Sequence, residues 1–154
     1  MGLDKNHFTK LFIGFNTNYS KNGVEIEIDL EKFGKKLDLA QNVLDAQVWN
    51  DVQKYMPMDT GNMIAETNIL NQATRGEVYL YPPELDYGHY QYEGILYVDP
   101  VTGSPFATEG TKKVPANPVR NLTYQNSMAE SHWGEVAIEN HKNQWVQVVK
   151  NVFK

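Results

Sequence analysis

The sequence predicts one α+β domain, in which a small mixed or antiparallel sheet packs with two long helices at about 31–55 and 128–153. Three observations support this class: a strictly alternating segment, a long helical period directly after it, and a second helical period near the C-terminal end. The 154 residues are 41% hydrophobic and 21% charged, which suits one domain with a real core.

The first part of the chain predicts an arm and a strand. Residues 1–22 follow neither period cleanly, so we interpret them as an N-terminal arm, and residues 23–154 as the single α+β domain. Val24–Leu30 alternates between apolar and acidic residues, which is typical of a half-buried strand. If the arm pairs with this strand, Asn22-Gly23 closes a β-hairpin.

The first long helix is predicted over 31–55. Apolar residues recur there at steps of three and four, from Phe33 to Tyr55. Pro57 ends the helix, because the residue before a proline is pushed out of the α region. Trp49 lies off the apolar stripe, so it either faces another element or subunit or simply widens the core face.

The middle of the chain predicts short elements and loops. Asp59-Thr60-Gly61-Asn62 has the composition of a turn, in which Asp59 or Thr60 caps a short segment over 62–66. Strands are expected at 77–81 and 95–98, and residues 84–95 form a tyrosine- and glycine-rich crossing segment between them.

A long exposed loop over 99–119 follows, beginning with a hairpin-like tip at 99–105. The last helix is predicted to begin at a capping box, with Ser127 as N-cap and Glu130 three positions later.

Several function classes are excluded or disfavoured. The chain has no cysteine, which rules out disulfides, thiolate zinc sites and cysteine nucleophiles. Its net charge of −5 has the wrong sign for a general nucleic-acid binder, and no apolar run approaches the roughly 18–20 residues that cross a bilayer. No phosphate loop or dinucleotide fingerprint is present, so no cofactor is expected.

Two weak patterns could carry chemistry. Asp86, His89 and Glu93 would share one face of a helix and form the best metal candidate, although a metal site usually needs a more complete set of ligands. The triplet Asp59-Thr60-Gly61 resembles that of aspartic proteases, which require it between strands and in a dimer. Because the triplet follows a long helix here, it does not fit the protease arrangement, and we predict no catalytic residues. We also predict no metal, because the ligand set is incomplete.

Aromatic residues give the stronger signal. Six of the nine tyrosines fall within residues 79–97, and tyrosine offers a large contact area with a polar tip. They either form a protein interface or cover one sheet face. The candidate interface residues are Tyr87, Tyr90, Tyr92, Trp49, Pro100, Gly103 and Phe106.

The order of these segments resembles a known family. The segments are the helix to Tyr55, the turn Pro57-Met58-Asp59-Thr60-Gly61, a strand, the run Tyr87–Gly94, the hairpin-like Val98–Gly103, and Ser131-His132-Trp133 in the opening of the final helix. Over residues 30–153 this order is similar to the minor capsid and neck proteins of tailed bacteriophages of Gram-positive hosts, which share a helix that ends in a Pro-x-x-Thr-Gly turn.

The resemblance implies a non-enzymatic head–tail connector, or tail-completion protein, of the virion, assembled in the host cytoplasm. It would form a homo-oligomeric ring with a six-fold multiple of subunits. Its partners would be connector or stopper proteins and the tail terminator or tail tube, with transient passage of double-stranded DNA and no membrane. Pro57, Asp59, Thr60, Gly61 and Trp133 would be its structural motif. The alternatives are a non-enzymatic partner-binding module of a mobile element and a metal-dependent accessory hydrolase.

Overall fold

The structure is a computed structural model that describes residues 16–21, 24–84 and 86–154, with side chains for 31–84 and 87–154. The elements are β1 (Asn16–Lys21), β2 (Val24–Asp29), α2 (Leu30–Val52), the 3-10 helix η1 (Gln53–Tyr55), α3 (Asn62–Ala73), α4 (Asp86–Glu93), β3 (Tyr97–Val98), β4 (Val114–Pro115) and α5 (Trp133–Val152). The α+β class is confirmed. Of the predicted arm, residues 1–15 and 22 lie outside the described residues, and the remainder forms β1.

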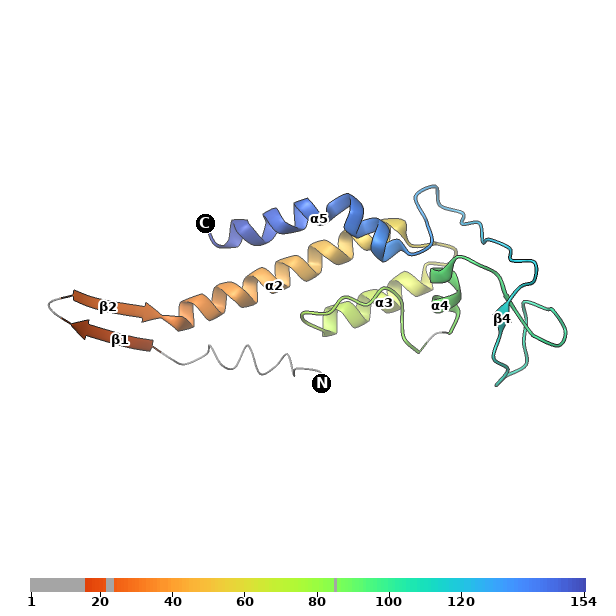
Figure 1. Cartoon of the computed structure of the whole chain (residues 1–154), viewed down its shortest axis with the longest axis horizontal. Coiled ribbons are helices and arrows are strands. Elements are labelled where there is room, and N and C mark those ends of the chain that lie inside the picture. The colour runs from red at the N-terminus through yellow and green to blue at the C-terminus, as the bar shows by residue number, and fades with distance from the viewer. Residues whose placement is uncertain (1–15, 22–23, 85) are drawn as a thin grey trace.

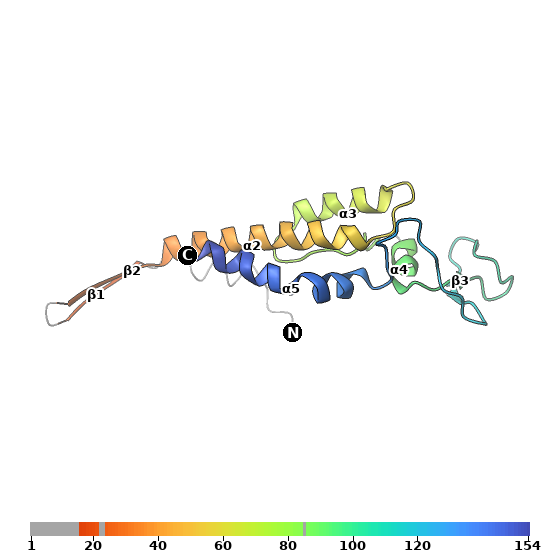
Figure 2. The same cartoon turned by 90° about the horizontal axis from the view of Figure 1, so that it is seen from above.

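Two long helices form the body. α2 and α5 run antiparallel along each other, and α3 lies against another side of α2 (Figures 1 and 2). The predicted helix over 31–55 is confirmed, with its last turn tightened into η1. Their shared core contains Trp49, Val52, Tyr55, Met56, Met63, Trp133 and Ala137. It lies in the half of the body near the end of α2, so that end is the more firmly packed.

The described strands form two separate two-stranded sheets, one at each end of the molecule (Figure 1). β1 pairs antiparallel with β2, with Asn16 opposite Asp29 and Lys21 opposite Val24, so the described part of the arm pairs with this strand. The turn expected at Asn22-Gly23 lies outside the described residues. The expectation that one sheet packs with both helices is wrong for the described residues. The reason is that β2 runs directly into α2, so the hairpin extends beyond the helix instead of folding back onto it.

The strand predicted over 77–81 is also wrong. This segment is extended but pairs with a side chain: the Asn71 amide accepts a bond from the Tyr79 N–H (2.7 Å) and donates one to the Tyr79 carbonyl (3.1 Å). Trp133 Nε1 then donates to the Leu80 carbonyl at 2.9 Å. Asn71 and Trp133 therefore satisfy backbone groups that a neighbouring strand would otherwise bond.

Two helices differ from the expected segments. α3 continues to Ala73, well past the expected 62–66, and its N-cap is Gly61 at φ 82°, so neither Asp59 nor Thr60 is the N-cap. The crossing segment predicted over 84–95 contains α4.

The chain before α5 corrects the predicted start of the last helix. α5 begins at Trp133, so Ser127 is not its N-cap. The Glu130 N–H donates to the Tyr55 carbonyl at 3.1 Å, and the Asn126 amide donates to the Met56 carbonyl at 3.0 Å. These bonds tie residues 126–130 to the end of η1 and hold them out of the helix.

Only part of the predicted loop over 99–119 lacks backbone pairing with the rest of the domain. β4 lies within it and pairs with β3, with Val98 opposite Val114. The neighbouring Ala116 is buried, and its N–H donates to the Leu96 carbonyl at 2.9 Å. The part of the loop that projects is therefore its first half, residues 99–113.

Candidate functional site

The most distinctive surface feature is the turn of residues 99–106, here called the projecting turn. Asp99 Oδ1 accepts bonds from the N–H groups of Val101 (2.8 Å) and Thr102 (2.9 Å). These N–H bonds, first that of Thr102 and then that of Val101, lower the pKa of Asp99. The Asp99 N–H donates to the Ser104 carbonyl at 2.8 Å, and the Phe106 N–H donates to Ser104 Oγ at 3.0 Å. The turn is thus held by its own hydrogen bonds.

This turn presents two bare apolar side chains. Val101 is 90% exposed and Phe106 is 87% exposed. Gly103 lies between them at φ 67°, a left-handed conformation that favours glycine. Residues 100–108 contain no charged side chain. The turn, which contains the candidates Pro100, Gly103 and Phe106, therefore offers an uncharged apolar surface in a fixed shape.

The aromatic candidates divide into two groups. Trp49 and Tyr92 are used within the chain: Trp49 is buried and donates to Asn68 Oδ1 at 2.8 Å, so it faces α3, while the Tyr92 ring packs edge-on to Trp133. Tyr90 is half-buried, and Tyr87 is 43% exposed. Of the four, Tyr87 remains the best placed to meet another molecule.

Tyr92 also makes a polar contact across the core edge. Its hydroxyl donates to Glu135 on the first turn of α5. Burial and the Glu135 carboxylate raise the pKa of Tyr92, and the bond from Tyr92 lowers the pKa of Glu135. The pair fixes α4 against the start of α5.

A hollow of about 320 Å³ lies at the turn between η1 and α3. Its lining residues are Pro57, Asp59, Thr60, Gly61, Asn62, Met63, Tyr87 and Gln91. The predicted structural motif thus forms one side of this hollow, which is here called the Pro57 hollow, and α4 forms the other. Trp133, the last member of that motif, is fully buried in the core instead.

A second hollow of about 390 Å³ separates α2 from α3. Amide side chains dominate its wall, among them Asn42, Asn50, Asn68 and Gln72. Two side chains of this wall already accept hydrogen bonds from within the chain. Asn68 accepts one from Trp49, and Asp45 accepts one from the Gly76 N–H at 2.7 Å.

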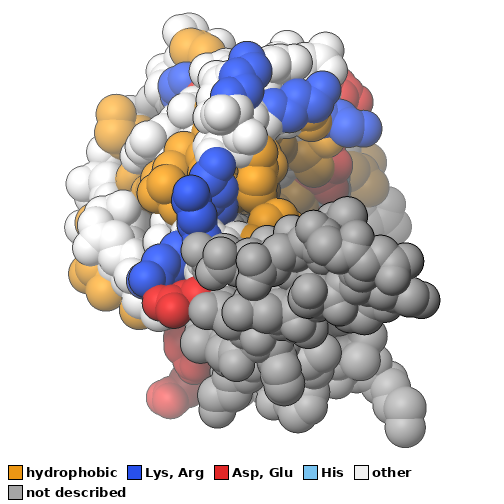
Figure 3. Space-filling view, turned by 90° about the vertical axis from the view of Figure 1, so that its left-hand side faces the viewer, with side chains coloured by type: hydrophobic (Ala, Val, Ile, Leu, Met, Phe, Trp, Pro, Cys, Tyr) orange, Lys and Arg blue, Asp and Glu red, His pale blue; other side chains and the backbone are white. Residues whose placement is uncertain are grey.

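Lysines gather toward the C-terminal end of α5, at the opposite end of the body. Lys and Arg side chains surround hydrophobic ones where α2 begins and α5 ends (Figure 3). Residues 140–154 contain three lysines and no acidic residue, although the whole chain is acidic. The Phe33 and Phe153 rings lie 6.1 Å apart there. The C-terminal end of α5 therefore differs in charge from the projecting turn.

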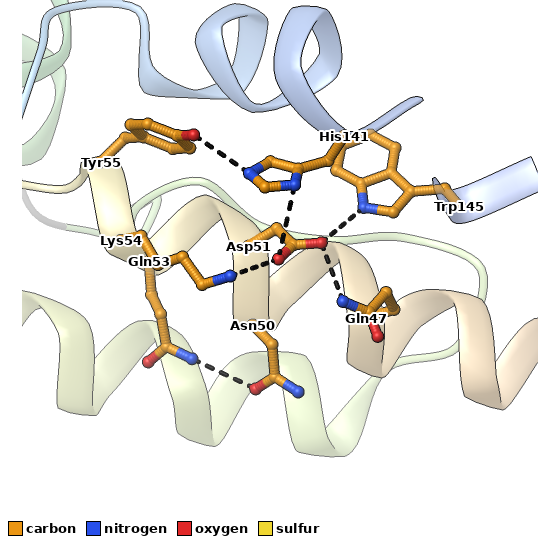
Figure 4. A network of polar contacts seen from close by, with 8 residues as sticks. All are labelled: Gln47, Asn50, Asp51, Gln53, Lys54, Tyr55, His141 and Trp145. Atoms are coloured by element: carbon orange, nitrogen blue, oxygen red, sulfur yellow. Dashed lines mark hydrogen bonds and ion pairs between the residues drawn. The ribbon is translucent and has the colours of Figure 1, made fainter. Parts of the chain in front are cut away.

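The polar cluster centred on Asp51 joins α2 to α5 (Figure 4). Asp51 is 1% exposed, and its Oδ2 accepts bonds from Gln47 Nε2 (2.9 Å) and Trp145 Nε1 (2.8 Å). Its Oδ1 accepts from Lys54 Nζ at 2.6 Å and lies 3.8 Å from His141 Nδ1. His141 Nε2 in turn lies 3.0 Å from the Tyr55 hydroxyl.

This cluster is a structural clasp. Burial alone would raise the pKa of Asp51, but the bonds from Gln47, Lys54 and Trp145, with the nearby His141, lower it to about 2. Both carboxylate oxygens already accept hydrogen bonds, and neither hollow described above is lined by Asp51 or His141. Sequence reasoning missed Asp51. The available signal was a carboxylate inside the apolar stripe of α2, together with His141 and Trp145 four apart on α5.

The metal candidate is incomplete among the described side chains. His89 Nδ1 lies 3.9 Å from Glu93 Oε1, and the side chain of Asp86 lies outside the described residues. No group of three or more histidine or acidic side chains that could hold a metal is found in the described part of the chain. Asp59 lies on an exposed turn between η1 and α3, with helices and not strands on either side.

Comparisons of the chain with protein-family models, with curated proteins and with solved structures find no match. Among the described residues, no helix combines the length and the hydropathy that a bilayer crossing requires.

Proposed function

We propose that this protein is a structural component of a tailed-bacteriophage neck, where it assembles as a ring that joins the DNA-filled head to the tail. The ring contains a six-fold multiple of subunits and lets double-stranded DNA pass through. Its neighbours are the adjacent connector or stopper and the tail terminator or tail tube. It assembles in the host cytoplasm and resides in the virion.

The observation that carries this proposal is the projecting turn. Val101 and Phe106 are almost fully exposed, yet hydrogen bonds hold the turn that presents them. Exposed apolar groups lose the free energy that burial would give, at roughly 25 cal/mol per Å². A turn that holds such groups rigidly in water is favourable when a partner protein covers them.

Two further features support an assembly role. The body is elongated, with the β1–β2 hairpin at one end and the projecting turn at the other (Figure 1). Distinct surfaces at separate places on a subunit are what repeated head-to-tail contacts require. The order of motifs between residues 30 and 153 adds the resemblance to phage neck proteins.

The experiment is a concentration series of native mass measurements on the full chain, followed by negative-stain electron microscopy of any large species. Closed rings with a central hole and a six-fold multiple of subunits are expected, alone or after addition of phage capsid and tail proteins. A protein that stays monomeric and binds none of these proteins would refute the proposal and favour a partner-binding module of a mobile element. Stoichiometric metal that is lost in Glu93→Ala would instead favour the hydrolase alternative.

A further inference from the structure

We propose that the projecting turn of one copy inserts Phe106 into the Pro57 hollow of a second copy. The contact rests on the proposed function in that it supplies the subunit interface of the ring. It names the partner as another molecule of this chain and the site as residues 57–63 with α4.

The projecting turn has the properties of an inserting element. Phe106 and Val101 are the two most exposed large apolar side chains of the described residues. The Phe106 N–H is fixed by Ser104 Oγ, and Asp99 fixes the backbone around Val101. A pre-ordered turn loses little conformational entropy on binding, which favours an anchor that enters a pocket.

The Pro57 hollow has the properties of an acceptor. Its volume of about 320 Å³ is large enough for one aromatic side chain. Pro57, Met63 and Tyr87 supply apolar walls. Asn62 and Gln91 supply amide groups at the same site, able to bond the backbone of an incoming turn.

The lack of positive charge on both surfaces favours a protein partner over a nucleic acid. Neither residues 100–108 nor the lining of the Pro57 hollow contains a lysine or arginine. Nucleic-acid binding depends on such cations to neutralise phosphates, so neither surface suits DNA. The uncharged turn with its two exposed apolar side chains complements the apolar walls and neutral amides of the hollow, in which Asp59 is the one acidic lining residue.

The turn is placed to reach a second copy. It projects at the end of the molecule beyond α4, where the β3–β4 pairing anchors it (Figures 1 and 2). The Pro57 hollow lies back along the body, between the start of α3 and α4. In the proposed ring this contact runs in one direction between neighbouring copies, which makes it heterologous, and its repetition closes a ring when the rotation between copies allows.

Site-directed cross-linking tests the contact directly, because the chain has no cysteine of its own. Full-length Pro105→Cys protein is mixed with Thr60→Cys protein and treated with a short bismaleimide. A heterodimer is expected. The matched control replaces Thr60→Cys with Ile69→Cys, which places the thiol on an exposed position of α3 outside the hollow lining. Equal yields at the two positions would overturn the proposal.

A second change tests the role of the aromatic ring. Phe106→Ser in the Pro105→Cys protein is expected to lower the cross-link to Thr60→Cys at least about tenfold, as for an interface anchor. An unchanged yield would overturn the insertion of Phe106.

Mixing variants tests the direction of the contact. Phe106→Ser removes the anchor, and Asn62→Trp fills the hollow, so neither variant alone is expected to self-associate. A mixture retains one intact anchor and one intact hollow, and we expect a two-copy complex from it. Rings that form without the cross-link would refute this contact while leaving the neck function standing, whereas the cross-link without rings would refute the ring alone.

Discussion

The Asp51 clasp predicts a defined loss of stability and a defined pH dependence. The change is Asp51→Asn, which keeps the size of the side chain and removes its charge. Asp51 accepts bonds from Gln47, Lys54 and Trp145, and Trp145 comes from the opposite helix. The variant therefore weakens the polar link between α2 and α5 without opening a cavity.

The magnitude follows from the pKa of Asp51. Its fall from 3.8 to about 2 corresponds to an upper value of roughly 2.5 kcal/mol, at about 1.4 kcal/mol per pKa unit. Lys54 is half-exposed, so solvent screens part of this interaction. We expect the free energy of unfolding at about pH 7 to fall by about 1–2 kcal/mol in the variant.

The sign of the pH dependence is fixed by the direction of the shift. Because folding lowers the pKa of Asp51, its stabilisation is present above the unfolded value of 3.8 and is lost as pH falls through about 2. The difference between wild type and Asp51→Asn should therefore shrink across that acidic window.

Urea denaturation at a series of pH values, followed by tryptophan fluorescence, measures this difference. Glu139→Gln, at an exposed position on α5, is the matched control and should stay within about 0.5 kcal/mol of wild type. A difference between wild type and Asp51→Asn that stays constant down to the acidic limit would refute the clasp.

Three further changes test other contacts. Asn71→Leu removes both bonds to the Tyr79 backbone and should cost about 1–3 kcal/mol in urea denaturation. Gly94→Ala should cost about 2–5 kcal/mol, because φ is 72° and an added Cβ would lie 2.4 Å from the Ser131 Cβ. Asp99→Ala should speed hydrogen exchange of the amides in the projecting turn and weaken self-association, with little change in global stability.

The first two of these changes have a contrast within the chain. Gln72→Leu, at an exposed neighbouring position on α3, should leave stability nearly unchanged. Gly103→Ala shares the positive φ of Gly94 but has no atom within 4 Å of the added Cβ, so it should cost only the backbone share, about 1–2 kcal/mol. Equal losses at the two glycines would show that the clash with Ser131 is absent in solution.

The elements that were predicted correctly from the sequence are those that a pattern of neighbouring residues specifies. The stripe from Phe33 to Tyr55 places the first helix within a few residues of α2 and η1, because one face of it packs along α5. The Ser127 capping box failed because tertiary bonds from residues 126 and 130 to η1 compete with helix formation. The extent of α3 was missed because its sequence, NMIAETNILNQA, has little apolar periodicity.

Parts of the candidate sites could not be predicted because they join distant residues. Asp51 meets Trp145, which lies 94 positions along the chain, and no local pattern encodes that pairing. Trp49 faces α3 through Asn68, a contact that depends on where the chain turns. The exposed residues at 100–106 were predictable, since an uncharged stretch rich in proline and glycine favours a projecting turn.

The stability of the fold and self-association through the projecting turn depend on different residues, and Phe106→Ser tests this difference. Phe106 is 87% exposed and adds almost nothing to the core, so the variant should unfold within about 0.5 kcal/mol of wild type. Asp51→Asn should do the reverse, with lower stability and unchanged self-association at a concentration where it stays folded. If Phe106→Ser destabilised the isolated chain as much as a core substitution, its ring would be packed within the subunit, and the projecting turn would not be an interface.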